Sequence, residues 1–141
     1  MADLTVYINE KITLNGNDRG VLTTQTITGI NNIDNRIFNI PSGSITTLFS
    51  LSDVPNAGTF TTSSIKYIRL TNKSTTNTPI KLIVSSSTEA ISYLISTGSS
   101  YMISTSKITG SLINIVFDNI VAVKAEPSGS SALIEYFIAT T

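Results

Sequence analysis

The chain has 141 residues, of which only 13% are charged, with nine basic side chains balanced by nine acidic ones and no His, Cys or Trp. Most enzymes need a group that titrates near neutral pH or a nucleophile held beside a base, so this composition predicts a protein that is not an enzyme. The length fits a single domain over residues 1–141, which is large enough to bury a core without disulfides. Because the chain has no Cys, it forms no disulfides.

Apolar and polar residues alternate from the start of the chain, which predicts β-strands. Leu4, Val6 and Ile8 begin the pattern, and it runs up to Asn15-Gly16, a dipeptide typical of tight turns between strands. The Thr-rich residues 21–29 predict a second strand. Asn and Asp residues over 31–35 indicate a break, after which the sequence predicts short strands over 36–40 and 44–51.

The rest of the chain repeats this pattern of short strands and polar turns. Residues 53–58 form the clearest loop, and Pro79 is expected at the entrance of a strand, where its missing N–H costs little. Residues 126–131 predict the turn of a closing hairpin. The strands expected after residue 60 are 64–71, 80–85, 90–95, 101–104, 111–117, 120–125 and 132–139.

This spacing of short strands predicts an all-β fold, an antiparallel β-sandwich of jelly-roll-like type. No segment of ten or more residues has a persuasive amphipathic helical pattern. Alternate positions of the strands should fill the space between two sheets. The expected core residues are Ile68, Leu70, Leu82, Val84, Ile113, Ile115, Phe117, Val121, Val123, Leu133 and Phe137.

Acidic residues are the first candidates for a site. A glycosidase-like pair of carboxylates could be drawn from Asp34, Asp53, Glu89, Asp118, Glu126 and Glu135. No spacing singles out a pair, so we interpret these carboxylates as solvated groups on loops and strand edges.

Oxygen-rich and small-residue segments are the next candidates. Residues 17–20 and 31–35 resemble calcium-binding loops in composition, but neither has the D-x-[DN]-x-[DN]-G pattern, so both are interpreted as turns. The serine tracts 85–87 and 128–131 have no G-x-S-x-G context and no His to act as a base. Gly98 and Gly129 stand alone, which indicates no phosphate cradle. The sequence therefore predicts no catalytic, cofactor-binding or metal-binding residue.

Tyrosines are the remaining candidates, because they are favoured at protein interfaces and on sugar-binding faces. Half-buried strands also favour tyrosine, and we prefer that interpretation. The five are Tyr7, Tyr67, Tyr93, Tyr101 and Tyr136.

Charge and hydropathy limit the partners. Lys and Arg are scattered rather than gathered in a stripe, so no nucleic-acid partner is expected. No apolar run is long enough for a membrane-spanning helix, and residues 1–11 have neither the basic nor the apolar region of a signal peptide. We therefore expect a protein that stays soluble inside the cell that makes it. A neutral surface rich in Ser and Thr suits a subunit docked against other proteins, although an AT-rich genome produces the same enrichment.

Three segments of the second half carry a family likeness: SIKYIRLTNKSTTNTPIKLIVSSS, AISYLISTGSSYMIS and NIVAVKAEPSGSSALIEYFIAT. Over residues 64–139 this succession resembles small β-sandwich virion proteins of tailed bacteriophages. Those proteins share an IRLTN-like strand before a polar loop, an I-x-L strand, a turn ahead of a strand of the form S-Y-x-I, and a closing L/I-E-Y-x-I hairpin. Residues 1–30 lie outside the likeness, and two alternatives stay open for them: an extra pair of strands, or an N-terminal arm that reaches a neighbouring subunit.

The resemblance implies a structural protein located in the virion and made in the host cytoplasm. A capsid auxiliary or decoration subunit is the preferred expectation, with the major capsid protein as its main partner and with many copies or a homo-oligomer in each particle. A tail, neck or portal-associated subunit is the first alternative. A carbohydrate-binding or adhesin module is the second, and the absence of Trp weakens it.

Overall fold

The computed structural model describes residues 1–104 and 120–141, and in these ranges almost all regular structure is β-strand. The helical element of this part of the chain is one short 3₁₀ turn, η1 (Thr62–Ser64). The strand expected over 111–117, with Ile113, Ile115 and Phe117, lies outside the described residues, as does Asp118. The strands are β1 (Ala2–Glu10), β2 (Thr13–Leu14), β3 (Asn17–Asp18), β4 (Val21–Ile30), β5 (Asn32–Ile40), β6 (Thr46–Ser52), β7 (Phe60–Thr61), β8 (Ile65–Asn72), β9 (Ile80–Ser85), β10 (Ala90–Ile95), β11 (Ser100–Ser104), β12 (Ala122–Pro127) and β13 (Ala132–Thr140).

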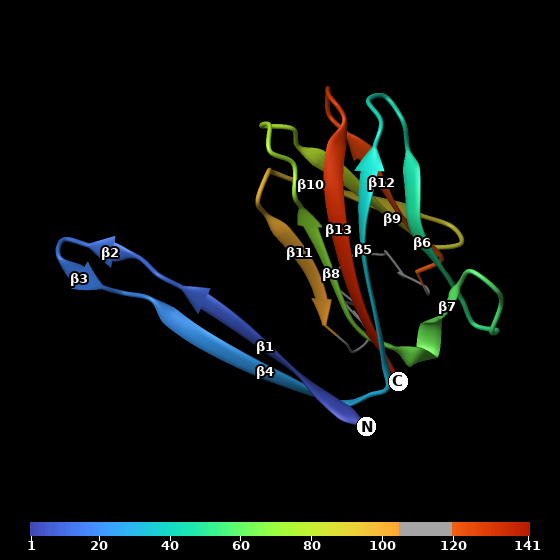
Figure 1. Ribbon diagram of the computed structural model, residues 1–141, viewed down its shortest axis with the longest axis horizontal. Coiled ribbons are helices and arrows are strands. Elements are labelled where there is room, and N and C mark those ends of the chain that lie inside the picture. Colours follow the sequence, from blue (N-terminus) through green and yellow to red (C-terminus); the bar gives the residue numbers. More distant parts are fainter. Residues whose placement is uncertain (105–119) are drawn as a thin grey trace.

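Two sheets pack face to face to form the body of the molecule (Figure 1). One has the order β10-β9-β12-β6-β7 and the other the order β11-β8-β13-β5. Apart from the short parallel pairing of β6 with β7, every pairing in the two sheets is antiparallel.

The connections between the two sheets follow jelly-roll order. Consecutive strands of the described part of the chain lie in different sheets at six points: β5 and β6, β7 and β8, β8 and β9, β10 and β11, β11 and β12, and β12 and β13. The last strand of the sandwich, β13, returns to pair with its first strand, β5, and β12 pairs with β6. This confirms the prediction of an all-β antiparallel sandwich of jelly-roll type.

The predicted hairpin between the last two strands is wrong. β12 pairs with β6 and β9 in one sheet, whereas β13 pairs with β5 and β8 in the other. The loop between them is long enough to carry the chain across the sandwich, and its Ser128 N–H donates to the Pro79 carbonyl. The two strands therefore lie face to face, with Val123 and Ala125 buried on one and Ile134 buried on the other.

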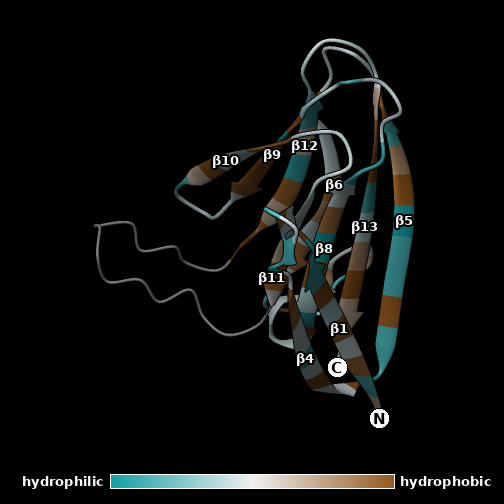
Figure 2. Ribbon diagram, turned by 90° about the vertical axis from the view of Figure 1, so that its left-hand side faces the viewer, coloured by the Kyte–Doolittle hydropathy of each residue, from teal (hydrophilic) through white to brown (hydrophobic). Residues whose placement is uncertain are grey.

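The break predicted over residues 31–35 is also wrong, because β5 begins at Asn32. Its whole length pairs with β13, from Asn32 opposite Thr140 to Ile40 opposite Ala132. A nine-residue backbone ladder outweighs the weak preference of Asn and Asp for turns. Polar residues are tolerated here since β5 is an edge strand, and hydropathy alternates along it (Figure 2).

The core lies between the sheets. Ile68, Leu70, Leu82, Val84 and Val123 are buried there as predicted. Other members of this cluster are Ile40, Leu48, Phe49, Leu51, Ile80, Ile95, Ala125, Ala132, Ile134, Tyr136 and Ile138.

Three of the expected core residues lie elsewhere. Val121 is 42% exposed because it precedes β12, and Leu133 is 37% exposed because it points away from the core between buried Ala132 and Ile134. Phe137 also points outward, and it packs in a second cluster on the outside of the sheet. Two-residue periodicity identifies the alternating sets of a strand, but it does not say which set faces inward.

Residues 2–30 form a long hairpin, called the arm here, in which β1 pairs with β4 in a separate two-stranded sheet. The arm projects away from the sandwich (Figure 1). At its tip, β2 and β3 are joined by Asn15 and Gly16, both with positive φ, as a type I′ turn requires. The turn predicted from this dipeptide is present.

Candidate functional site

Three of the candidate carboxylates pair with basic side chains rather than with one another. Glu135 lies 2.6 Å from the Arg69 guanidinium, and Glu126 lies 3.2 Å from the Lys81 ammonium. Asp34 pairs with Arg36 on the same strand. Within residues 1–104 and 120–141, no group of three or more acidic side chains is placed to hold a metal ion. Asp34, Glu126 and Glu135 therefore act in ion pairs and not as a catalytic dyad with one another.

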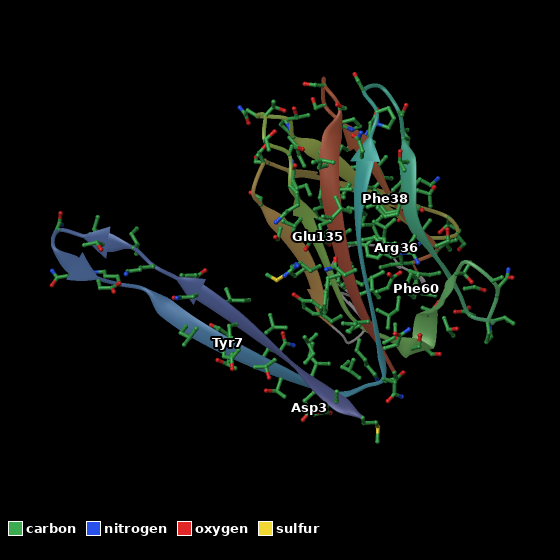
Figure 3. The ribbon with its side chains drawn as sticks, viewed as in Figure 1. Asp3, Tyr7, Arg36, Phe38, Phe60 and Glu135 are labelled. Atoms are coloured by element: carbon green, nitrogen blue, oxygen red, sulfur yellow. The ribbon has the colours of Figure 1, made fainter. Side chains whose placement is uncertain are left out.

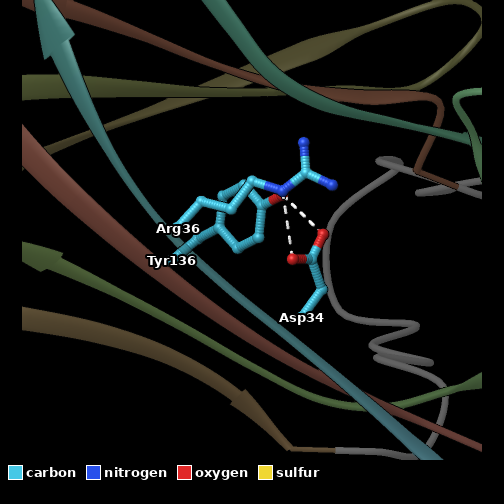
Figure 4. Close-up of polar contacts among 3 residues, drawn as sticks. All are labelled: Asp34, Arg36 and Tyr136. Carbon is cyan, nitrogen blue, oxygen red and sulfur yellow. Dashed lines mark hydrogen bonds and ion pairs between the residues drawn. The ribbon is translucent and has the colours of Figure 1, made fainter.

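Asp34, Arg36 and Tyr136 form a polar cluster where β5 lies against β13 (Figure 4). The Tyr136 hydroxyl donates to Asp34 Oδ2 at 2.8 Å, and Arg36 Nε donates to Asp34 Oδ1 at 3.1 Å. Burial, the hydrogen bond to Asp34 and the Asp34 charge together raise the pKa of Tyr136 to about 12. A phenol with this pKa stays protonated at neutral pH, so it serves as a hydrogen-bond donor and not as a base.

Aromatic rings surround this cluster and explain why Tyr136 is held there. Its ring centroid lies 5.6 Å from the rings of both Phe38 and Phe49, and Phe49 meets Phe60 edge-to-face at 6.1 Å. Arg36, Phe38 and Phe60 lie at the same side of the sandwich, near β5 and β7 (Figure 3). The contacts are those of a packed sandwich edge, with the Tyr136 hydroxyl satisfied by Asp34.

The other small-residue and oxygen-rich segments have structural roles. At the arm tip, Asp18 Oδ1 accepts from the Gly20 N–H at 3.0 Å. Ser86 Oγ accepts from the N–H of Glu89 at 3.0 Å, which closes the turn between β9 and β10. Gly98 and Gly129 occupy turn positions with positive φ. The arm tip and the two serine tracts therefore agree with the interpretation as turns, whereas residues 32–35, which were interpreted in the same way, lie in β5.

The five tyrosines are distributed over four places. Tyr7 lies on the arm, away from the sandwich (Figure 3). Tyr136 lies in the core cluster described above, and Tyr67 is buried against Phe137 on the outside of the sheet. Tyr93 and Tyr101 stack at a centroid distance of 4.6 Å, joining β10 of one sheet to β11 of the other. The structure brings together only this last pair.

The base of the arm is anchored on the outside of the sheet. Leu4, Val6, Ile27 and Ile30 of the arm gather with Tyr67, Phe137 and Ala139 of β8 and β13 in a second apolar cluster. This contact was missed because periodicity alone could not show that the outward side of a body strand is covered by another part of the chain. The alternating apolar residues of β1 were the available signal.

Among the described residues, none of the body covers the rest of the arm. Every residue from 7 to 26, called the distal arm here, is exposed. The large apolar side chains exposed on the distal arm are Tyr7, Ile8, Ile12, Leu14, Val21 and Leu22. The charged residues of the distal arm lie near its tip and are Glu10, Lys11, Asp18 and Arg19. Residues 7–9 and 21–26, called the shaft of the arm here, therefore form an uncharged, partly apolar ribbon that is exposed to water.

The body carries a matching surface, called the outer face here, on β5 and β13. Ile33, Ile37 and Leu133 are exposed on it, and by register Ile33 lies opposite Ala139 and Ile37 opposite Glu135. The charged pair on this side, Arg69 with Glu135, is mutually neutralised, and the Arg69 guanidinium also lies 5.7 Å from the Phe137 ring. The arm and the outer face are therefore the features best suited to binding another protein.

No helix in the described part of the chain has the length and hydropathy needed to span a membrane. Comparisons with protein-family models, with curated proteins and with solved structures give no match for this chain.

Proposed function

We propose that this protein is a non-enzymatic structural subunit of a tailed-phage virion, and specifically a capsid auxiliary or decoration protein that binds at joints of the capsid shell. The observation that carries the proposal is a jelly-roll body joined to a projecting arm whose uncharged apolar side chains are exposed. A subunit of this construction works by docking against other proteins. The likeness of residues 64–139 to small virion proteins supplies the class of particle.

The mechanism is cohesion. Neutral Ser- and Thr-rich surface and the apolar arm can be buried without desolvating charge, so each contact gains apolar burial at little electrostatic cost. A contact of about 800 Å² on each partner is enough for a specific interface, and the symmetry of the shell repeats it many times. The main partner is the major capsid protein, and the protein is present in many copies.

Quantitative mass spectrometry of purified particles from the phage that carries this gene tests the proposal. A decoration subunit is expected in many copies, at a fixed ratio to the major capsid protein. A tail, neck or portal-associated subunit, the first alternative, would be present only in the number that one ring needs. Absence of the chain from washed particles would refute both assignments.

A second experiment tests the cohesive role. Particles assembled without the protein should break at a lower temperature than complete ones, and purified protein added back should restore their resistance. The matched control is the protein with the polar substitution Val54→Ser, which changes one exposed loop residue away from the arm. Particles whose heat resistance does not depend on the protein would contradict cohesion.

One observation favours the carbohydrate-binding alternative, namely the stacked pair Tyr93 and Tyr101, with Tyr93 partly exposed. Sugar rings stack on exposed aromatic faces. In this pair, however, Tyr101 faces Tyr93, so each ring covers a face of the other. A glycan array that gives no specific hits would remove this alternative, and hits lost on Tyr93→Ala would replace our proposal.

A further inference from the structure

The arm is a single ribbon that is anchored at one end and unsupported at the other. By register, Leu4 lies opposite Ile27 and Ile8 opposite Thr23, so the side of the ribbon that seats on the body continues outward through Ile8 to Val21, opposite Glu10. Ile8 and Val21 are exposed, whereas Ile27 is buried. The apolar stripe therefore extends beyond the surface that it covers.

Such a ribbon is poorly suited to standing alone. A two-stranded hairpin is marginally stable in water, and stable sheets need a third strand or a packed face. β4 has ten residues without Pro, Lys, Arg, Asp or Glu, and the outer edges of β1 and β4 pair with no other strand in the described residues. Natural edge strands are usually protected by charge, Pro or a covering element. β4 lacks these protections, as a segment covered in an assembly would.

The surface that suits the stripe is present on the body of the same chain. The base of the arm already packs on the outside of β8 and β13, against Phe137 and Ala139. The outer face continues from this seat along β5 through Ile33 and Ile37, which are 58% and 60% exposed. Up to Ile8 the stripe carries no charge, and the charged pair on this part of the face, Arg69 with Glu135, is neutralised within the pair. Glu10, opposite Val21, lies at the outer end of the stripe.

The arm cannot use the outer face of its own molecule, since it projects away from the sandwich (Figure 1). A second copy has no such restriction, and with a net charge of zero two copies do not repel each other. We propose that the stripe of the distal arm around Ile8 and Val21 docks on the outer face of a second copy, around Ile33 and Ile37. This inference goes beyond the proposed function and does not depend on it.

The contact joins two different surfaces, so it produces two copies that exchange arms, a closed ring in which each copy passes its arm to the next, or an open filament of copies. In each arrangement the arm gains the packed face that it lacks in a single copy.

Sedimentation of the full chain over a range of concentrations tests the proposal. The wild-type protein should associate reversibly, and Ile8→Lys on the arm or Ile37→Lys on the outer face should each weaken association by about tenfold or more, because each buries an unpaired ammonium. Val54→Lys is the matched control, since it also charges an exposed apolar residue but lies in the loop after β6. Far-ultraviolet circular dichroism should show that all three variants are folded.

A cross-linking experiment locates the contact independently of stability. The chain has no Cys, so a protein with Ile8→Cys and one with Ile37→Cys each carry a single thiol. After mixing and mild oxidation, the mixed disulfide should exceed that formed by Ile8→Cys with Val54→Cys. Wild-type protein that stays monomeric at the highest concentration would overturn the proposal. Lysine variants on the arm and face that associate as strongly as Val54→Lys, or equal cross-linking in both mixtures, would do so too. Particle composition tests the virion assignment separately, so failure of one proposal is distinguishable from failure of the other.

Discussion

Asn72 provides the sharpest test of how this sequence holds its loops. It is fully buried at the end of β8, and its side chain makes three hydrogen bonds. Nδ2 donates to the carbonyls of Thr78 at 2.9 Å and Ile95 at 3.1 Å, and Oδ1 accepts from the Ser74 N–H at 3.0 Å. One amide thus joins the loop after β8 to the end of β10.

Asn72→Ala removes the side-chain partner of two carbonyls and one N–H at a buried site. A buried unpaired group costs about 1–3 kcal/mol, and partial relaxation keeps the sum for three groups to about 3–4 kcal/mol. For a chain of 141 residues, this corresponds to a fall in melting temperature of about 10 °C. Asn39→Ala is the control, because Asn39 is an exposed residue of β5, and we expect it to change stability by less than about 0.5 kcal/mol.

The assay is urea unfolding followed by circular dichroism, with thermal melts as a second measure. Asn72→Asp adds a pH test, because its carboxylate would face the carbonyls of Thr78 and Ile95. Burial would raise its pKa in the folded state above the ordinary value of about 4, so the variant should lose stability relative to wild type as pH rises above 4. An Asn72→Ala protein within about 1 kcal/mol of Asn39→Ala would refute the reasoning.

Three further substitutions test other parts of the structure. Tyr136→Phe removes the hydroxyl bond to Asp34 and should cost about 1–2 kcal/mol at pH 7. Folding raises the pKa of Tyr136 from 10 to about 12, so its protonated form stabilises the folded state below pH 10, and this contribution is lost as pH rises through 12. The free energy of unfolding should therefore fall less steeply with rising pH in this range for Tyr136→Phe than for wild type. Gly29 has a φ of +78°, which strains any residue with a side chain, but an added Cβ meets no atom within 4 Å. Gly29→Ala should therefore cost about 1 kcal/mol from backbone strain alone. A fall in melting temperature of more than about 6 °C would indicate a clash and contradict this. Glu135→Gln should cost about 1–2 kcal/mol by weakening the pair with Arg69, an effect that high salt reduces; an unfolding free energy equal to wild type at low salt would contradict this.

Much of the sandwich could be predicted from the sequence because its strands obey local rules. Alternation and turn residues placed the strands around Ile68 and Leu82 within a residue or two, and Asn15-Gly16 specified its turn. Pairing between strands was less accessible, since it depends on contacts distant in sequence. The strand containing Val123 therefore was expected to form a hairpin with the next one, but it lies in the opposite sheet.

The interaction surface was harder to predict than the fold. Phe137 and Leu133 were both expected in the core because an apolar residue on a strand usually faces inward. They point outward instead: Phe137 forms part of the seat of the arm, and Leu133 is exposed on the outer face. An apolar residue on the wrong side of a strand is recognisable only when register is known, and that information comes from pairing. The proposed interfaces therefore lie where apolar residues of a strand point outward instead of into the core.

Cryo-electron microscopy of the intact phage particle would show where the protein binds. We predict density for a two-layered β-sandwich with a projecting hairpin, repeated over the joints between capsid subunits. Density for the chain confined to the tail or neck would contradict the decoration assignment, and a particle with no such density would contradict the virion role as a whole.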